Sequence, residues 1–189
     1  MKRGAWTSIA LCMSLLALLP GCRQPTGNSL AEASSKVISD GAHQGTESHF
    51  FFLPPMVEQP SFSGVLDTTL APLVRIVNID TDVVVASYAM GQGTSGLRLE
   101  GDHFQVDWNT ADSALQPDRT YRIQILVPAG DCLILVGYAD LDVVESGKEF
   151  RNVNTQQYIP LLDGRTLPIK FRIEQGARIH PPTAAISVM

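Results

Sequence analysis

Apolar and polar residues alternate along three short segments of this chain, residues 104–108, 121–127 and 169–173. A period of two is typical of a β-strand that buries one face and exposes the other to water. Gly, Pro, Asp and Asn residues separate the segments, as expected of turns, and residues 78–82 and 128–131 are predicted to be tight reversals. The pattern therefore predicts antiparallel strands packed around a common apolar interior.

Three further segments, residues 73–79, 83–90 and 133–144, are more continuously apolar and rich in β-branched side chains. Such composition is typical of strands that are covered by neighbours. We therefore expect these three strands to lie nearer the middle of a packed pair of sheets.

The dipeptide Asp163-Gly164 lies between two apolar arms. It predicts a two-residue β-hairpin with a type I′ turn. Pro160 and Pro168 lie on the two arms, and proline has no N–H to donate to a strand ladder. We expect the arms to pair poorly at these prolines or to face a sheet edge there.

The segment from Leu115 to Tyr121 resembles the corner between the fifth and sixth strands of fibronectin type III domains and related sandwiches. Pro117 should fix the turn, and Leu115 should close the end of the core. The Tyr121 ring should be buried while its hydroxyl bonds to upstream backbone. With about eight strands and no amphipathic helical segment between them, the chain is predicted to be all-β, an immunoglobulin-like or fibronectin type III-like antiparallel β-sandwich.

The N-terminus has the order of a secretory signal, with Lys2 and Arg3 followed by an apolar run and small residues. That run of about 15 residues is shorter than the ~20 that a membrane-spanning helix needs. The residues Leu19-Pro20-Gly21-Cys22 resemble the lipobox of bacterial lipoproteins, which implies cleavage before Cys22 and lipidation of its sulfur. Ordinary cleavage near Gly21, or retention of the segment, is the alternative.

The chain is predicted to have four regions. Residues 1–21 form the lipoprotein signal peptide, and residues 22–48, which are rich in small and polar side chains, form a flexible tether. Residues 49–176 form one β-sandwich domain, a length that suits a single core. Residues 177–189 form a disordered tail.

Two segments, residues 49–55 and 163–172, look like the opening and closing of an uncharacterised β-domain that recurs in predicted secreted and surface proteins of environmental bacteria. The resemblance covers most of residues 49–176. It implies an envelope or extracellular setting and no particular activity.

Charge and cysteine content narrow the classes of partner. The chain has 14 Lys and Arg against 19 Asp and Glu, a formal net charge of −5. Removal of residues 1–21 takes Lys2 and Arg3 and leaves 12 − 19 = −7, which argues against nucleic-acid binding and against docking onto anionic lipid. With Cys12 in the signal and Cys22 carrying lipid, we expect Cys132 to be a packed, inert thiol and no intrachain disulfide to form.

Two groups of oxygen ligands are candidates for a loose calcium site. Asn78, Asp80 and Asp82 are spaced like the start of a calcium loop, but Val83 and Ala89 replace the glycine and the glutamate of an EF-hand. The second group is Asp140, Asp142 and Glu145. Turn formation and solubility are the alternative roles of these residues.

Three other features of the sequence favour structural roles over catalysis or ligand binding. The residues 91–96 fit G-x-G-x-x-G, but the alternating segment that follows is no helix to hold a pyrophosphate, so we expect a loop and no cofactor. His103 is the only histidine within residues 50–176, and neither a nucleophile elbow nor a catalytic carboxylate pair accompanies it, so no enzyme activity is predicted. Trp108 shares a face with Phe104 and Val106, which favours core burial over a sugar-stacking surface.

We therefore expect a lipid-anchored, non-catalytic structural or interaction module of the cell envelope, facing the periplasm or the exterior. Its contacts would be the membrane, through lipid on Cys22, and an envelope protein or glycan. The alternative is a carbohydrate-binding or calcium-dependent binding module. An exposed aromatic platform would favour this alternative, whereas a buried Trp108 would favour the scaffold.

Overall fold

The computed structural model describes residues 38–43, 45–92, 96–117, 119–144 and 159–179. The strands are β1 (Ile38–Ser39), β2 (Phe50–Phe52), β3 (Leu73–Asn78), β4 (Val83–Ala89), β5 (Arg98–Glu100), β6 (His103–Asn109), β7 (Thr120–Ala129), β8 (Cys132–Val144), β9 (Ile159–Leu162) and β10 (Thr166–Ile173). One 3-10 turn, η1 (Thr110–Ser113), follows β6. The described residues contain no α-helix, and hence no helix that could cross a membrane.

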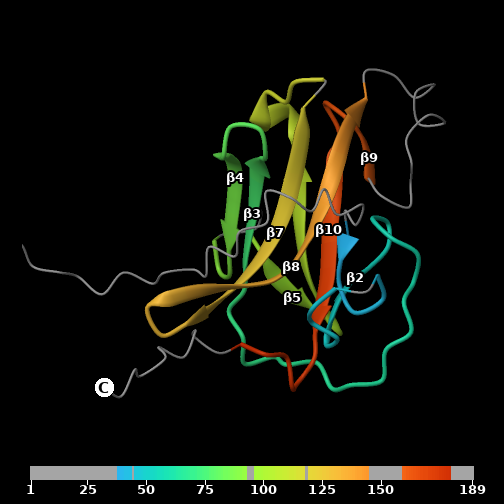
Figure 1. Ribbon diagram of the computed structural model, residues 1–189, viewed down its shortest axis with the longest axis vertical. Helices are drawn as coiled ribbons and strands as arrows, with labels where there is room; N and C mark the ends of the chain where they lie inside the picture. Colours follow the sequence, from blue (N-terminus) through green and yellow to red (C-terminus); the bar gives the residue numbers. More distant parts are fainter. Residues whose placement is uncertain (1–37, 44, 93–95, 118, 145–158, 180–189) are drawn as a thin grey trace, which may run out of the picture.

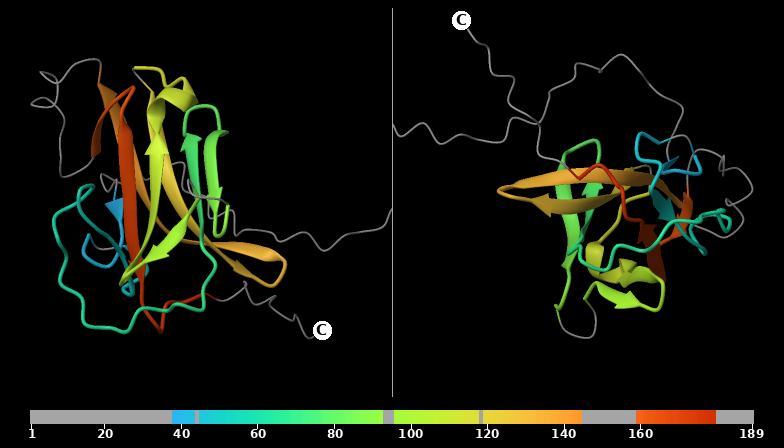
Figure 2. Two further views of the ribbon diagram at one scale, coloured as in Figure 1. Left: turned by 180° about the vertical axis from the view of Figure 1, so that it is seen from behind. Right: turned by 90° about the horizontal axis from the view of Figure 1, so that it is seen from below.

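The strands form two sheets that pack as a sandwich (Figures 1 and 2). Sheet A has the order β1-β8-β7-β3-β4, and β9 pairs in parallel with β8. Sheet B has the order β2-β10-β6-β5, and all its pairs are antiparallel. The predicted all-β sandwich is therefore confirmed.

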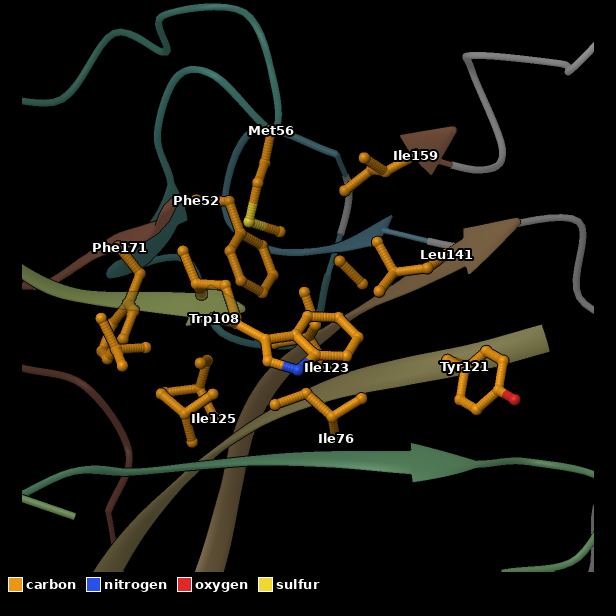
Figure 3. Close-up of a cluster of buried hydrophobic side chains, with 14 of the residues drawn as sticks. Phe52, Met56, Ile76, Trp108, Tyr121, Ile123, Ile125, Leu141, Ile159 and Phe171 are labelled. Carbon is orange, nitrogen blue, oxygen red and sulfur yellow. The ribbon is translucent and has the colours of Figure 1, made fainter. Parts of the chain in front are cut away.

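The alternating segments supply the core, as their pattern predicts (Figure 3). Phe104, Val106 and Trp108 on β6 are all 0% exposed. The Phe104 ring stacks on that of Phe171 from β10, with ring centroids 5.5 Å apart. Burial of such aromatic side chains contributes about 1.5–3 kcal/mol each, so these residues dominate the stability of the sandwich.

The predicted corner joins β6 of sheet B to β7 of sheet A. The Tyr121 ring is 2% exposed and Leu115 is buried beside it. The Gln116 N–H donates to the Tyr121 hydroxyl oxygen at 2.9 Å. This bond holds the crossing between the two sheets at a fixed place, as the resemblance implied.

Strands β2 to β8 and β10 match the immunoglobulin plan except at one place, and β1 and β9 are additions beside β8. That plan has strands A, B, E and D in one sheet and C, F and G in the other, with C′ beside C in variable domains. Strands β3 to β8 take the places of C, C′, D, E, F and G in chain order, and β2 takes the place of A. The place of B, at the centre of sheet B, is taken by β10 from near the C-terminus.

The predicted Asp163-Gly164 hairpin is wrong. The turn exists and Gly164 has a φ of 77°, but its two arms belong to different sheets. Strand β9 pairs in parallel with β8, while β10 pairs with β2 and β6. The turn therefore serves as a crossover between the two sheets, and an isolated two-stranded hairpin would be only marginally stable in water.

The folded part extends past both predicted boundaries, residues 49 and 176. Ile38 and Ser39 pair with Ala139 and Tyr138 of β8, so the end of the predicted tether is part of sheet A. Residues 177–179 of the predicted tail contact the core through Ala177 and Ile179. Strand pairing thus holds residues 38–39, and the Arg178 N–H, which donates to Glu47 Oε2 at 2.8 Å, helps to hold residues 177–179.

Candidate functional site

The predicted lipidation site, Cys22, lies outside the described residues. Cys132 is disulfide-bonded, and its partner also lies outside them. The prediction that Cys132 is a packed thiol in a chain without disulfides is therefore wrong. Proximity in the fold, which spacing along the chain does not reveal, decides this pairing.

The first candidate calcium group forms the turn between β3 and β4. The Asn78 side-chain oxygen accepts the Asp80 N–H at 3.0 Å, and Asp80 forms a 3.3 Å ion pair with Arg119. Asp82 adopts a φ of 56°, which aspartate tolerates better than most residues. These contacts give the three residues the turn-forming role that was the alternative to calcium binding.

The second group is neutralised in part by arginine. Asp140 accepts two bonds from the Arg122 guanidinium, at 2.6 and 2.8 Å. The hydrogen bond to Asp140 raises the pKa of Arg122, and the guanidinium also lies 4.0 Å from the centre of the Tyr138 ring. Asp142 follows two residues along β8, and Glu145 lies outside the described residues.

Strand β7 separates the two groups, because Asn78 on β3 pairs with one side of Tyr121 and Leu141 on β8 pairs with the other. In the part of the chain that the structure describes, no group of three His, Cys, Asp or Glu residues could hold a metal. The arrangement thus gives the calcium alternative no support.

The residues weighed for sugar binding and catalysis have structural contacts. Trp108 is fully buried, as predicted, and its indole N–H donates to Ser113 Oγ at 2.9 Å. His103 Nδ1 lies 3.1 Å from Asp102 Oδ1, and this bond lowers the pKa of the Asp102 carboxyl. Gly91 begins the G-x-G-x-x-G loop with a φ of 78°, residues 93–95 lie outside the described part, and the strand β5 follows rather than a helix.

Three of the sheet edges have features that block further pairing. At β2 the Phe52 N–H donates to Asp40 Oδ2 at 3.0 Å, and the Gly41 N–H donates to the Phe50 carbonyl at 2.7 Å. Asp40 is 0% exposed and covers the strand from outside. Charges, short strands and proline are the usual means by which proteins protect an edge.

The β5 and β9 edges use those means. Strand β5 has three residues, and Arg98 forms ion pairs with Glu100 and Asp107 at 3.0 and 2.9 Å. Strand β9 has four residues and contains Pro160, whose place at an edge agrees with the expectation from the sequence. Neither strand offers a long row of free N–H and C=O groups.

Strand β4 is the contrasting edge of sheet A (Figure 1). It has seven residues with no charge and no proline, and Val83 and Val84 are 55% and 47% exposed. Among the described residues, its protective features are a β-bulge at Val85, where the register with β3 shifts, and an isolated parallel bridge from Met90 to Leu97 just beyond its end. The prediction that residues 83–90 lie near the middle of a sheet is therefore wrong, because β3 covers only one side of them.

The open side of β4 can be assigned from one hydrogen bond. The Ala89 N–H donates to the Gln92 side-chain oxygen at 3.2 Å, so it does not face β3. Because N–H and C=O groups alternate in direction along a strand, those of Ser87 also point away from β3. Ser87 is exposed, and the free backbone of β4 is therefore accessible.

A second apolar surface lies at the far end of the β7–β8 hairpin, which projects from the sandwich (Figure 2). Strand β3 pairs with β7 only as far as Leu126. Leu133 and Leu135 are each 39% exposed there. Cys132, with its disulfide partner outside the described residues, lies in the same hairpin, so the surroundings of this surface are only partly described.

Comparisons with known proteins yield no counterpart: no family model, no curated protein and no solved structure matches this chain. The candidate site therefore depends on the contacts of this chain alone. Sequence reasoning identified the β4 segment as a strand but not as an edge. One signal could have raised the question: the apolar run is preceded by the charged Asp82, but it ends at Gly91 with neither a charged residue nor a proline directly after it.

Proposed function

We propose that this protein is a lipid-anchored, non-catalytic interaction module of the cell envelope, which binds a partner by adding a strand to β4. The observation that carries the proposal is a mismatch at β4: its sequence is that of a covered strand, yet one side of it is open. Places where local sequence and structure disagree are typical of functional sites. Strand addition would supply the missing neighbour through backbone hydrogen bonds.

The protected edges support the choice of β4. A buried carboxylate blocks β2, charged side chains occupy β5, and Pro160 interrupts β9. Strand β4, in contrast, carries neither a charged residue nor a proline. The bulge at Val85 limits the regular part of β4 to the residues from Ala86 onward, which confines an added strand to a short ladder.

Photo-cross-linking in intact cells tests the interaction. A photoreactive residue at Val84 should give adducts, while the same residue at Leu99 on β5 should not, although Leu99 is 40% exposed and thus comparable in accessibility. Equal yields from the two positions would contradict the proposal. The Leu99 control separates pairing at β4 from general stickiness of exposed apolar residues.

Intact mass tests the lipid anchor. Protein purified from membranes should have the mass of residues 22–189 plus acyl groups. A Cys22→Ala variant should have the mass of a chain that retains residues 1–21 and carries no acyl group. The chain has three cysteines, and cleavage before Cys22 with lipid on its sulfur leaves no partner for Cys132 within the same chain. The lipid anchor and an intrachain disulfide at Cys132 therefore exclude each other. A mass that changes on reduction by opening a Cys22–Cys132 bond would overturn the anchor.

A further inference from the structure

We infer that the strand added to β4 comes from a second copy of this chain, paired antiparallel about a two-fold axis at Ser87. This inference rests on the proposed use of β4 and names the partner. Both copies would then join their A sheets into one continuous sheet. The case depends on backbone direction, side-chain size and charge along β4.

Backbone direction fixes the register. The N–H and C=O groups of Ser87 point away from β3, as does the Ala89 N–H, which donates to Gln92 instead. In an antiparallel pair, a residue on the two-fold axis faces its own counterpart and exchanges two hydrogen bonds with it. Ser87 lies within the regular part of β4, beyond the bulge, and is therefore the residue that can take this place.

Side-chain size suits the same register. Ala86 and Tyr88 flank Ser87, and both contact the core from the same face of β4. Pairing about Ser87 places Ala86 opposite Tyr88 of the second copy, so a small side chain meets a ring on each side of the axis.

Charge selects the antiparallel arrangement. The residues from Val83 to Ala89 include no charged side chain, and Asp82 adjoins one end of the strand. Antiparallel pairing keeps the two Asp82 carboxylates at opposite ends of the ladder, whereas parallel pairing would place them side by side. Like charges directly opposite each other are destabilising in a sheet.

Charge-swapped copies test the register. Two full-length copies with different tags are co-expressed and extracted from membranes in detergent, and the fraction of one that co-purifies with the other is measured. Ser87→Lys in both copies should lower this fraction by about tenfold, and so should Ser87→Glu in both, because like charges would meet on the axis. One copy with Ser87→Lys and the other with Ser87→Glu should restore co-purification.

Controls use the exposed apolar residue of a protected edge. Leu99→Lys and Leu99→Glu on β5 should leave co-purification unchanged in every combination. The inference is overturned if wild-type copies do not co-purify, if Ser87→Lys in both copies has no effect, or if the mixed pair is not restored. If wild-type copies do not co-purify but cross-linking at Val84 gives adducts with a mass other than that of two copies, the partner is a different protein. The proposed function then stands, and the inference of a second copy fails.

A spin-label measurement does not require charged variants to fold. Nitroxides at Ser87→Cys should show strong dipolar broadening, since the two α-carbons on the axis would be about 5.5 Å apart. The same label at Leu99→Cys, with identical native cysteines, should show none. Broadening at both positions or at neither would overturn the inference.

Discussion

The β2 and β4 edges of this sandwich differ in how their backbone groups are satisfied. At β2 a buried carboxylate and a neighbouring N–H occupy the outward-facing backbone atoms. At β4, the contacts that the described residues show beyond β3 are a hydrogen bond from Ala89 to the exposed Gln92 side chain and an isolated bridge from Met90 to Leu97. The comparison teaches that the backbone groups of an edge strand are covered by local contacts, and that in this chain β2 has such contacts over its length whereas most of β4 does not.

The largest expected effect follows from removal of the carboxylate at β2. Asp40 accepts bonds from the N–H groups of Ala42, His43 and Phe52, and from His43 Nδ1 at 2.7 Å. Asp40→Ala would leave the buried Phe52 N–H unpaired and would remove the acceptor of the more exposed Ala42 and His43 groups, so it should lower the free energy of unfolding by about 2–3 kcal/mol. Urea denaturation measures it.

The matched control for Asp40→Ala is Asp131→Ala, at an exposed position in the β7–β8 turn, which should change stability by less than about 0.5 kcal/mol. A loss below about 1 kcal/mol in Asp40→Ala would show that the β2 edge does not depend on this carboxylate.

Amide hydrogen exchange rates should distinguish the β2 edge from the β4 edge without any substitution in β2. The Phe52 N–H, bonded to a fully buried oxygen, should exchange only on global or near-global opening. If β4 pairs as we infer, the Ser87 region should be protected in the wild-type chain. It should exchange about a hundredfold faster when both copies carry Ser87→Lys, since the added pairing would be lost. Equal exchange in the two proteins would contradict the pairing.

Substitution at the exposed part of β4 should affect stability little. Val84→Thr keeps the β-branched shape and removes apolar surface from a side chain that is 47% exposed. We expect a change in the free energy of unfolding within about 0.5 kcal/mol, measured by thermal or urea denaturation. A larger loss would mean that Val84 is covered within one chain, and that β4 is less open than its exposure indicates.

The smallest expected effect is on pH dependence. Partial burial raises the pKa of Tyr88 on β4, and the negative charge of Asp112 raises it further. Because the folded-state pKa is the higher one, the contribution of this phenol to stability is complete below its usual pKa and is lost as pH rises past it. Tyr88→Phe should flatten that alkaline loss in denaturation curves recorded from pH 9 to pH 11, a range that brackets about 10, the usual tyrosine value. An unchanged curve would show that another group titrates.

The fold followed from the sequence where local pattern and tertiary burial agree. Alternation placed Phe104 and Trp108 in the core, and the corner around Tyr121 has its hydrogen bond. Prediction failed where a segment's partner was not its neighbour in sequence. The Asp163-Gly164 turn signal is local and cannot report that its arms join different sheets.

The candidate site was only partly predictable for the same reason. An apolar, β-branched composition identified β4 as a strand, but strand order decides whether it has one neighbour or two. Likewise, carboxylate spacing suggested a calcium site, whereas the fold brings Arg122 to Asp140. Sequence spacing does not record cross-strand pairs, and these pairs determine the charge balance of each group.

The position of β10 has a consequence for biosynthesis. Ribosomes and export channels deliver a chain from its N-terminus, so β2 and β6 emerge long before the strand that lies between them. Until residues 166–173 arrive, sheet B has no centre and cannot close over the aromatic core. The sandwich is thus completed only after residues 166–173 have been delivered. Until then the chain would stay unfolded enough to pass through a channel, and copies that stop before β10 would be exposed to proteases.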